Sequence, residues 1–269
     1  MNVPNNDLKV VPQHLHLAKT VIAFWLLGWF LKADFFIPYI FSEVIRYPLT
    51  IDFFPALLRS PLVLQFFYVF PLFAFLVIFK PNYFYCCLAA VTMVSSSAVL
   101  LLHQDTHNDA TFLTSFWVAV WVLWFVTQMH RTDRAFLIHA RSLALCVIAV
   151  IFFGSFIGKL TPEYLNGTVF ADIFMRQNFG WVGQWVRAHY SEEVIRLSFY
   201  WVSKLIIFGE GFLAFAPIWP FGIVYRVGIG VMLAISLFTT WRIFSVLFCL
   251  IGLLYAFRNL PRPQDEEGS

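Results

Sequence analysis

The chain has 269 residues, of which 60% are hydrophobic and only 12% are charged, and Phe alone occurs 33 times. A soluble domain carries about twice this fraction of charged residues, so the composition indicates an integral membrane protein whose first partner is the lipid bilayer. The net charge of +3 is small and no basic stripe is present, so we expect no nucleic-acid partner.

Apolar segments of about 17 to 25 residues are the signal for membrane-spanning helices. In chain order they are 18–40, 62–80, 83–103, 111–129, 142–160, 197–217, 221–240 and 243–257. We therefore predict an all-α fold, a polytopic transmembrane helical bundle of about eight spans with interfacial helices. The bundle forms one domain, 18–257, between a cytoplasmic N-terminal segment, 1–17, and a disordered C-terminal tail, 258–269.

Two connections between these segments are predicted to lie at the membrane surface. Segment 41–61 carries three prolines among charged residues, which favours an interfacial loop or a short amphipathic helix. The connection 161–196 contains Trp181 and Trp185 together with arginines, and Trp favours the headgroup level.

The orientation is predicted from Lys and Arg in the loops, which are more frequent on the cytoplasmic side. With the N-terminus inside, that side carries nine: Lys9, Lys19, Lys80, Arg131, Arg134, Arg141, Arg226, Arg258 and Arg262. The opposite side carries six: Arg46, Arg59, Arg176, Arg187, Arg196 and Arg242. We expect a multi-pass protein with both termini cytoplasmic.

Ionisable residues within the predicted spans are candidates for function, because each costs roughly 2.5–3.5 kcal/mol on insertion scales. Lys32 and Asp34 lie in the first span, Lys204 and Glu210 in the sixth. Residues two or six apart do not face each other on a straight helix, so their partners must come from other helices. Two interpretations stand side by side: a ligand site, or buried polar pairing that holds the bundle together.

The turn HQDTHND joins the third and fourth spans. If it is helical, His103 and His107 share one face, and Asp105 and Asp109 share another. A histidine pair at this spacing can bind a metal, but two ligands do not make a site, and no cysteine spacing adds to them. We predict no metal site. The alternative to a ligand role for these side chains is a polar turn in which Asn108 or Asp109 caps the next helix.

Lys159 ends the fifth span, four residues before Glu163. It is a snorkelling anchor, half of an ion pair, or a base whose proton affinity is lowered by desolvation. Thr161-Pro162 disfavours a continuous helix, so Glu163 is expected either to pair with Lys159 or to begin a new helix as its N-terminal acid.

The stretch FFGSFIGKLTPEYLNGTVF resembles the signature of the HTTM superfamily, the membrane domain shared with vitamin K-dependent gamma-carboxylase. The matching positions are Phe153, Gly154, Gly158, Lys159-Leu160, Tyr164 and Gly167. DTHNDATFLTSFWVAVW and FGEGFLAFAPIWP are similar to two further family segments, so the resemblance covers roughly 100 to 255.

This resemblance implies chemistry on the non-cytoplasmic face, with Lys159 as the base that deprotonates a hydroquinone. The implied cofactor is a quinone or hydroquinone, with His107 assisting and His103, Asp105, Asp109, Glu163 and Glu210 as candidate ligand-binding residues. The family's histidine before the fourth span is Ala110 here, and nothing in the chain corresponds to the carboxylase's large lumenal domain. We therefore expect carboxylase-like or oxidoreductase-like chemistry with a quinol, in a protein of bacterial inner-membrane type, and not carboxylation of protein glutamates.

The alternative hypothesis is a non-catalytic accessory or assembly subunit with a membrane protein partner. A transporter is a third hypothesis, but transporters commonly contain an internal repeat and none is visible here.

Overall fold

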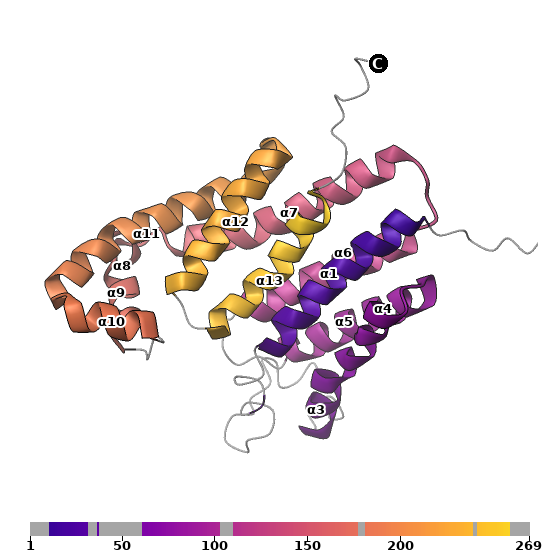
Figure 1. The fold of residues 1–269 in the computed structure, drawn as a ribbon, viewed down its shortest axis with the longest axis horizontal. Helices are drawn as coiled ribbons and strands as arrows, with labels where there is room; N and C mark the ends of the chain where they lie inside the picture. Colours follow the sequence, from indigo (N-terminus) through magenta and orange to yellow (C-terminus); the bar gives the residue numbers. More distant parts are fainter. Residues whose placement is uncertain are drawn as a thin grey trace, which may run out of the picture.

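The computed structural model describes residues 11–31, 37, 61–102, 110–176, 181–238 and 241–258, and every regular element within these ranges is a helix (Figure 1). The all-α prediction is confirmed for this part of the chain. Segment 41–60, residues 1–10 and the tail from 259 lie outside the described residues, as do Lys32 and Asp34.

The centre of the bundle is made by four helices: α1 (Pro12–Leu31), α5 (Tyr83–Leu102), α6 (Ala110–Thr127) and α13 (Trp241–Ala256). Trp25 and Trp29 of α1 stack on each other and are completely buried. The Trp25 indole N–H donates to the Ser115 carbonyl of α6 at 2.8 Å, so the polar end of this buried ring is satisfied.

The second predicted span is a composite of α3 (Pro61–Val69), a 3₁₀ segment η2 (Phe70–Phe75) and α4 (Leu76–Phe79). Pro71 lies at the start of η2. Because proline has no N–H to donate and clashes with the preceding turn, the helix tightens there and then resumes.

Two long helices, α7 (Arg134–Gly158) and α11 (Glu192–Ala214), run in opposite directions beside this centre, as Figure 1 shows. A short 3₁₀ turn, η3 (Ala216–Ile218), connects α11 to α12 (Phe221–Phe238), which packs between α11 and α13. The first half of α11 extends past the end of α7.

That extension carries three short helices: α8 (Pro162–Leu165), α9 (Thr168–Arg176) and α10 (Trp181–His189). Ala171 and Phe174 of α9 pack on Ile195 and Phe199 of α11, forming a small core separate from that of the bundle. We refer to α8–α10 as the cap. The prediction of an interfacial connection at 161–196 corresponds to this cap and to the first turn of α11.

The two ends of the described chain lie at one end of the bundle. His14, near the start of α1, is 3.0 Å from the Met129 carbonyl after α6, and Phe257, after α13, contacts the Trp121 ring of α6. Lys159 ends α7 at the opposite end.

Five helical segments are long and apolar enough to cross a membrane: Pro12–Leu31, Leu62–Phe79, Tyr83–Leu101, Arg134–Gly158 and Glu192–Ala214. Three shorter apolar segments lie in α6, α12 and α13. The structure therefore supports a membrane-embedded helical bundle. Helix α7 begins eight residues before the predicted span, because a helix continues through polar residues at which an apolar segment stops.

Candidate functional site

Lys159 and Glu210, which are far apart in the sequence, meet in an ion pair between α7 and α11. The ammonium nitrogen of Lys159 lies 2.8 Å from one carboxylate oxygen of Glu210 and 2.9 Å from the other. It also donates to the Ser155 hydroxyl at 2.5 Å. Among the seven residues that the sequence predicted for the site, these two are the ones that the described structure brings together.

The end of α7 explains where the lysine lies. Thr161 has an extended backbone before Pro162, so α7 cannot continue and Lys159 becomes the residue that follows its last turn. Side chains on helices lean toward the N-terminus, and the Lys159 side chain accordingly reaches back one turn to Ser155.

Two glycines explain why α11 can present a glutamate between two neighbouring helices. A methyl group on Gly209 would lie 2.6 Å from the Val231 side chain of α12, and one on Gly211 would lie 2.9 Å from the Phe156 ring of α7. Both separations are shorter than a Cβ atom allows, so a larger residue at either position would force a neighbour to shift. Glu210 therefore sits where α7 and α12 both pack closely on α11, and its position depends on its glycine neighbours.

The two members of the pair differ in access. The Glu210 side chain is 4% exposed, whereas that of Lys159 is 19% exposed. A molecule entering from outside would reach the ammonium group first. Of the three interpretations that the sequence left open for Lys159, half of an ion pair is the one that the structure shows. As an ammonium in this pair, Lys159 can act as a base only after it has given up a proton.

Glu163 does not join the pair. It is exposed in the first turn of α8, and no ion pair involves it within the described residues. Hydrogen bonds from its own backbone N–H and from Thr161 lower the pKa of its carboxyl group. Of the two expectations for this residue, the N-terminal acid of a new helix matches the structure.

The other candidate residues, His103, Asp105, His107 and Asp109, lie outside the described residues. Their proposed part in a ligand site stays a prediction. Within the described ranges, no three His, Cys, Asp or Glu side chains lie close enough together to hold a metal ion.

Ser155 is the one polar contact of Lys159 that the sequence analysis missed. The sequence could have predicted this contact, because Ser155 precedes Lys159 by four residues, and residues at that spacing are neighbours on a helix. Tyr200 and Trp201 beside Lys204 were also missed, and the sequence offered the same helical spacing.

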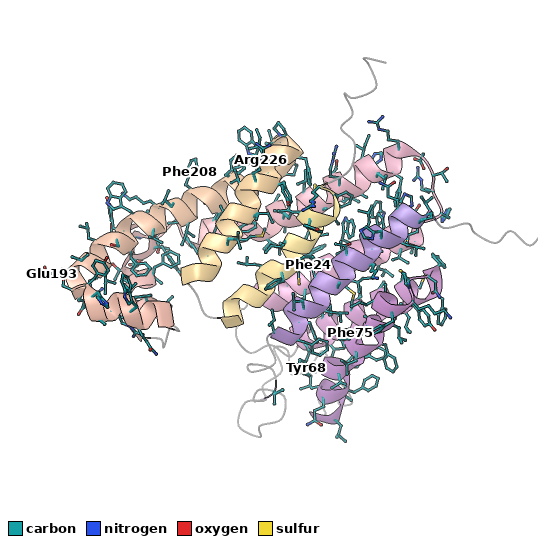
Figure 2. All side chains as sticks on the ribbon, in the orientation of Figure 1. Phe24, Tyr68, Phe75, Glu193, Phe208 and Arg226 are labelled. Atoms are coloured by element: carbon teal, nitrogen blue, oxygen red, sulfur yellow. The ribbon has the colours of Figure 1, made fainter. Side chains whose placement is uncertain are left out.

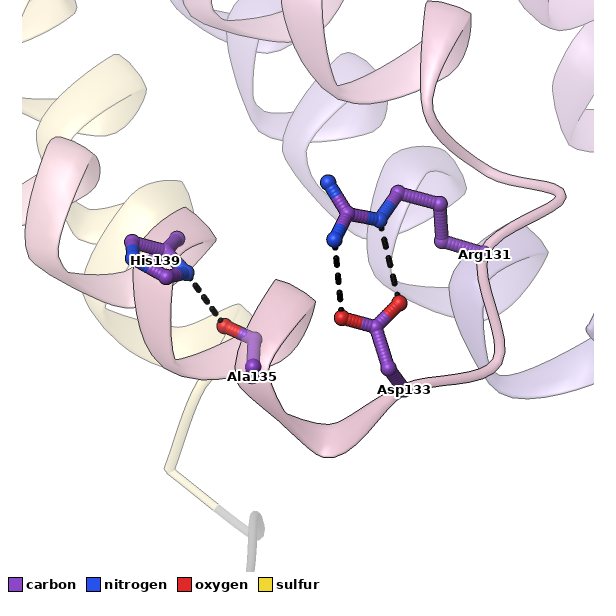
Figure 3. Close-up of polar contacts among 4 residues, drawn as sticks. All are labelled: Arg131, Asp133, Ala135 and His139. Atoms are coloured by element: carbon purple, nitrogen blue, oxygen red, sulfur yellow. Dashed lines mark hydrogen bonds and ion pairs between the residues drawn. The ribbon is translucent and has the colours of Figure 1, made fainter.

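A second ion pair lies at the other end of α7, in the turn after α6 (Figure 3). The Arg131 guanidinium donates to both Asp133 carboxylate oxygens, at 3.0 and 2.9 Å. This contact lowers the pKa of Asp133. Both side chains are well exposed, so this pair is a feature of the turn and not of a buried site.

Searches against protein-family models, curated proteins and solved structures found no match to this chain. The fold and the site define the class: a membrane-embedded protein, helical throughout its described elements, with a largely buried ion pair near one end of α7. No particular family follows from the comparisons, and the resemblance to the HTTM superfamily rests on the residues quoted for it.

Proposed function

We propose that this is an HTTM-like integral membrane protein that binds a quinol-type lipid ligand, with its phenolic group at Lys159. The observation that carries the proposal is the partly exposed ammonium of Lys159, held against a buried carboxylate at the end of a spanning helix. Ionisable groups at such depth are costly and are commonly functional. A phenolic headgroup suits this site because its oxygen can accept from the ammonium and its ring can pack on apolar side chains.

The pair offers a proton route that leaves the net charge of the site unchanged. Lys159 passes a proton to Glu210, the lysine amine then accepts the proton of a phenolic hydroxyl, and Glu210 keeps the first proton. The ammonium that re-forms faces the negative oxygen. Ser155 orients the lysine throughout. His107, with Asp105 or Asp109, is the proposed assistant from the turn between α5 and α6.

The test is extraction of the purified protein with organic solvent and mass spectrometry of bound isoprenoid quinones. The informative variant is Lys159→Gln with Glu210→Gln, because removing both charges leaves no uncompensated ion in the bundle. Arg226→Gln is the matched control, since Arg226 is an exposed cation on α12 and is outside the pair.

We expect a stoichiometric quinone in the wild-type protein and in Arg226→Gln, and at least a tenfold lower content in the double variant. Absence of quinone from the wild-type protein, or an equal content in the double variant, would contradict the proposal.

We further propose eight spans, with both termini cytoplasmic in a bacterial inner membrane. The support is that the three shorter apolar helices pack in the same bundle as the longer ones, and that the two ends of the described chain lie at one end of it.

One observation favours the second candidate, a non-catalytic subunit bound to a partner membrane protein. Four of the five residues at four-residue spacing on the exposed face of α7 are small: Ser142, Cys146, Gly154 and Gly158, with Val150 as the exception. A methyl group on Gly154 or Gly158 would meet nothing within 4 Å. Such rows allow close helix contact in membranes. A stoichiometric partner co-purified in mild detergent, without any quinone, would favour this candidate.

A further inference from the structure

Lys204 is a cation on α11 whose neighbours are aromatic. Its ammonium nitrogen is 2.5 Å from the Tyr200 hydroxyl, 3.8 Å from the centre of the Tyr200 ring and 5.5 Å from that of Trp201. No carboxylate pairs with it within the part of the chain that the structure describes. Arg196, two turns away on the same helix, differs in that it pairs with Asp172 and Glu192.

The surface around Lys204 is apolar on both sides along the helix. Trp201 is 62% exposed, Leu205 is 72% exposed and Phe208 is 76% exposed. Figure 2 shows Phe208 pointing away from the bundle. Side chains of this kind at the outside of a membrane bundle face acyl chains. Lys204 is therefore a positive charge on the lipid-facing side of α11.

The depth of Lys204 follows from helix geometry. On α7, Arg141 is followed by no other charged residue until Lys159. Ser155, which holds the lysine nitrogen, is about 21 Å along the helix from Arg141. Glu210 of α11 pairs with Lys159 and so lies at the level of Ser155. Lys204 precedes Glu210 by six positions, and because α11 is antiparallel to α7, Lys204 lies about 9 Å further from Arg141 than Glu210 does. Together the two distances are about 30 Å, the thickness of a hydrocarbon core.

This separation fits a position of Lys204 and Arg141 at the two faces of the hydrocarbon core. Tyr and Trp favour the interface, and Lys204 is surrounded by one of each. The cap begins at this level, where the Ser203 hydroxyl donates to the Tyr164 carbonyl of α8, and it continues beyond it, because Gly167 packs on the backbone of Phe199 and Tyr200.

We propose that Lys204, with Tyr200 and Trp201, binds the phosphate group of an anionic phospholipid. The ammonium supplies the positive charge and lacks an acidic partner in the described protein, and the two aromatic rings pack against the glycerol region. A lipid with a net negative charge, such as phosphatidylglycerol, is preferred over a zwitterionic one, because only the negative lipid neutralises the charge of Lys204. This inference does not depend on the ligand proposed for Lys159.

The test uses the full-length protein in detergent and native mass spectrometry after addition of phosphatidylglycerol or phosphatidylcholine. Lys204→Gln removes the charge, and Lys204→Arg keeps it. Arg196→Gln is the matched control because it removes a cation of α11 that already has carboxylate partners. A parallel sample contains inorganic phosphate as a competitor, which distinguishes a free anion from a lipid headgroup.

We expect the wild-type protein to retain phosphatidylglycerol over phosphatidylcholine, and Lys204→Gln to bind it about fivefold more weakly, with one fewer lipid retained. Lys204→Arg and Arg196→Gln should bind it as the wild-type protein does, and inorganic phosphate should not displace it. Equal retention by Lys204→Gln, equal loss in Arg196→Gln, equal binding of the two lipids or displacement by phosphate would each overturn the proposal.

Discussion

At the scale of single residues, the buried carboxylate of Glu210 determines what the Lys159 pair contributes to stability. Glu210 is almost fully buried, and Lys159 is its charged partner within the described residues. Removing one member of a buried pair leaves an uncompensated charge, which is far more costly than removing both. The pair thus ties α7 to α11 whether or not it binds a ligand.

Lys159→Gln alone should therefore lower the free energy of unfolding by about 3–5 kcal/mol, because it strands the Glu210 carboxylate. Adding Glu210→Gln should restore more than half of that loss. Thermal unfolding of the wild-type protein, both single variants and the double variant in one detergent measures the coupling. Additive effects of the two substitutions would mean that the residues do not form the pair in solution.

Gly167 offers a second prediction for a single residue. It has a φ of +75°, and a methyl group there would lie 2.5 Å from the Phe199 carbonyl oxygen. Gly167→Ala should cost about 1–3 kcal/mol through backbone strain alone, and more through the clash. Gly230→Ala on α12 is the control, since a methyl group there meets nothing within 4 Å, and it should be neutral or slightly stabilising. The measurement is the unfolding midpoint, and equal midpoints for the two variants would contradict the prediction.

At the scale of elements, the cap and the first half of α11 form a unit with its own small core. Phe174 packs on Phe199 with ring centres 5.0 Å apart, and the Arg187 guanidinium lies 5.7 Å from the centre of the Phe174 ring. A core of this size is held by few apolar contacts, so it should open more readily than the bundle.

Phe174→Ala should destabilise the cap by about 3 kcal/mol and leave the bundle folded. Hydrogen exchange in detergent should then become faster in α9 and α10, with unchanged exchange in α5 and α6. Leu113→Ala, at an exposed position of α6, is the matched control. Faster exchange throughout the protein would show that the cap is not a separate unit.

The turn between α6 and α7 contributes a pH dependence. Arg131 lowers the pKa of Asp133, so the folded state holds the ionised form more strongly than the unfolded chain does. The stabilisation is present above the ordinary carboxyl pKa, about 4, and is lost as the pH falls through the lower value of the folded state. Asp133→Asn should therefore be slightly less stable than the wild-type protein at pH 7 and equally stable at pH 2–3. A difference in the unfolding midpoint that stays constant with pH would contradict this.

The helices were predictable from the sequence to the extent that hydropathy alone defines them. Within the described residues, the long apolar segments fall on helices. The predicted start of α7 was late because Arg134 and Arg141 are polar, although both are helical. The pairing of Lys159 with Glu210 was not predictable. Spacing rules apply within one helix, whereas this contact depends on how α7 and α11 cross.

At the scale of the whole molecule, the described helices leave one question of topology that a measurement can decide. Helices α12 and α13 have 18 and 16 residues, which gives lengths of about 27 and 24 Å. Both are somewhat shorter than the hydrocarbon core of about 30 Å. They either cross the membrane or form a hairpin that enters and leaves on one side, and either arrangement keeps the end of α13 beside the start of α1.

We expect the two helices to cross, because Cys249 and Leu250 of α13 are buried in the same core as the spanning helix α1. In a variant without native cysteines, Trp241→Cys at the start of α13 should be labelled by a membrane-impermeant maleimide from the side that labels Tyr190→Cys in the cap. Lys80→Cys, after α4, should be labelled only from the other side. Labelling of Trp241→Cys from the Lys80 side, or from neither side, would replace eight spans by six, with α12 and α13 as a re-entrant hairpin.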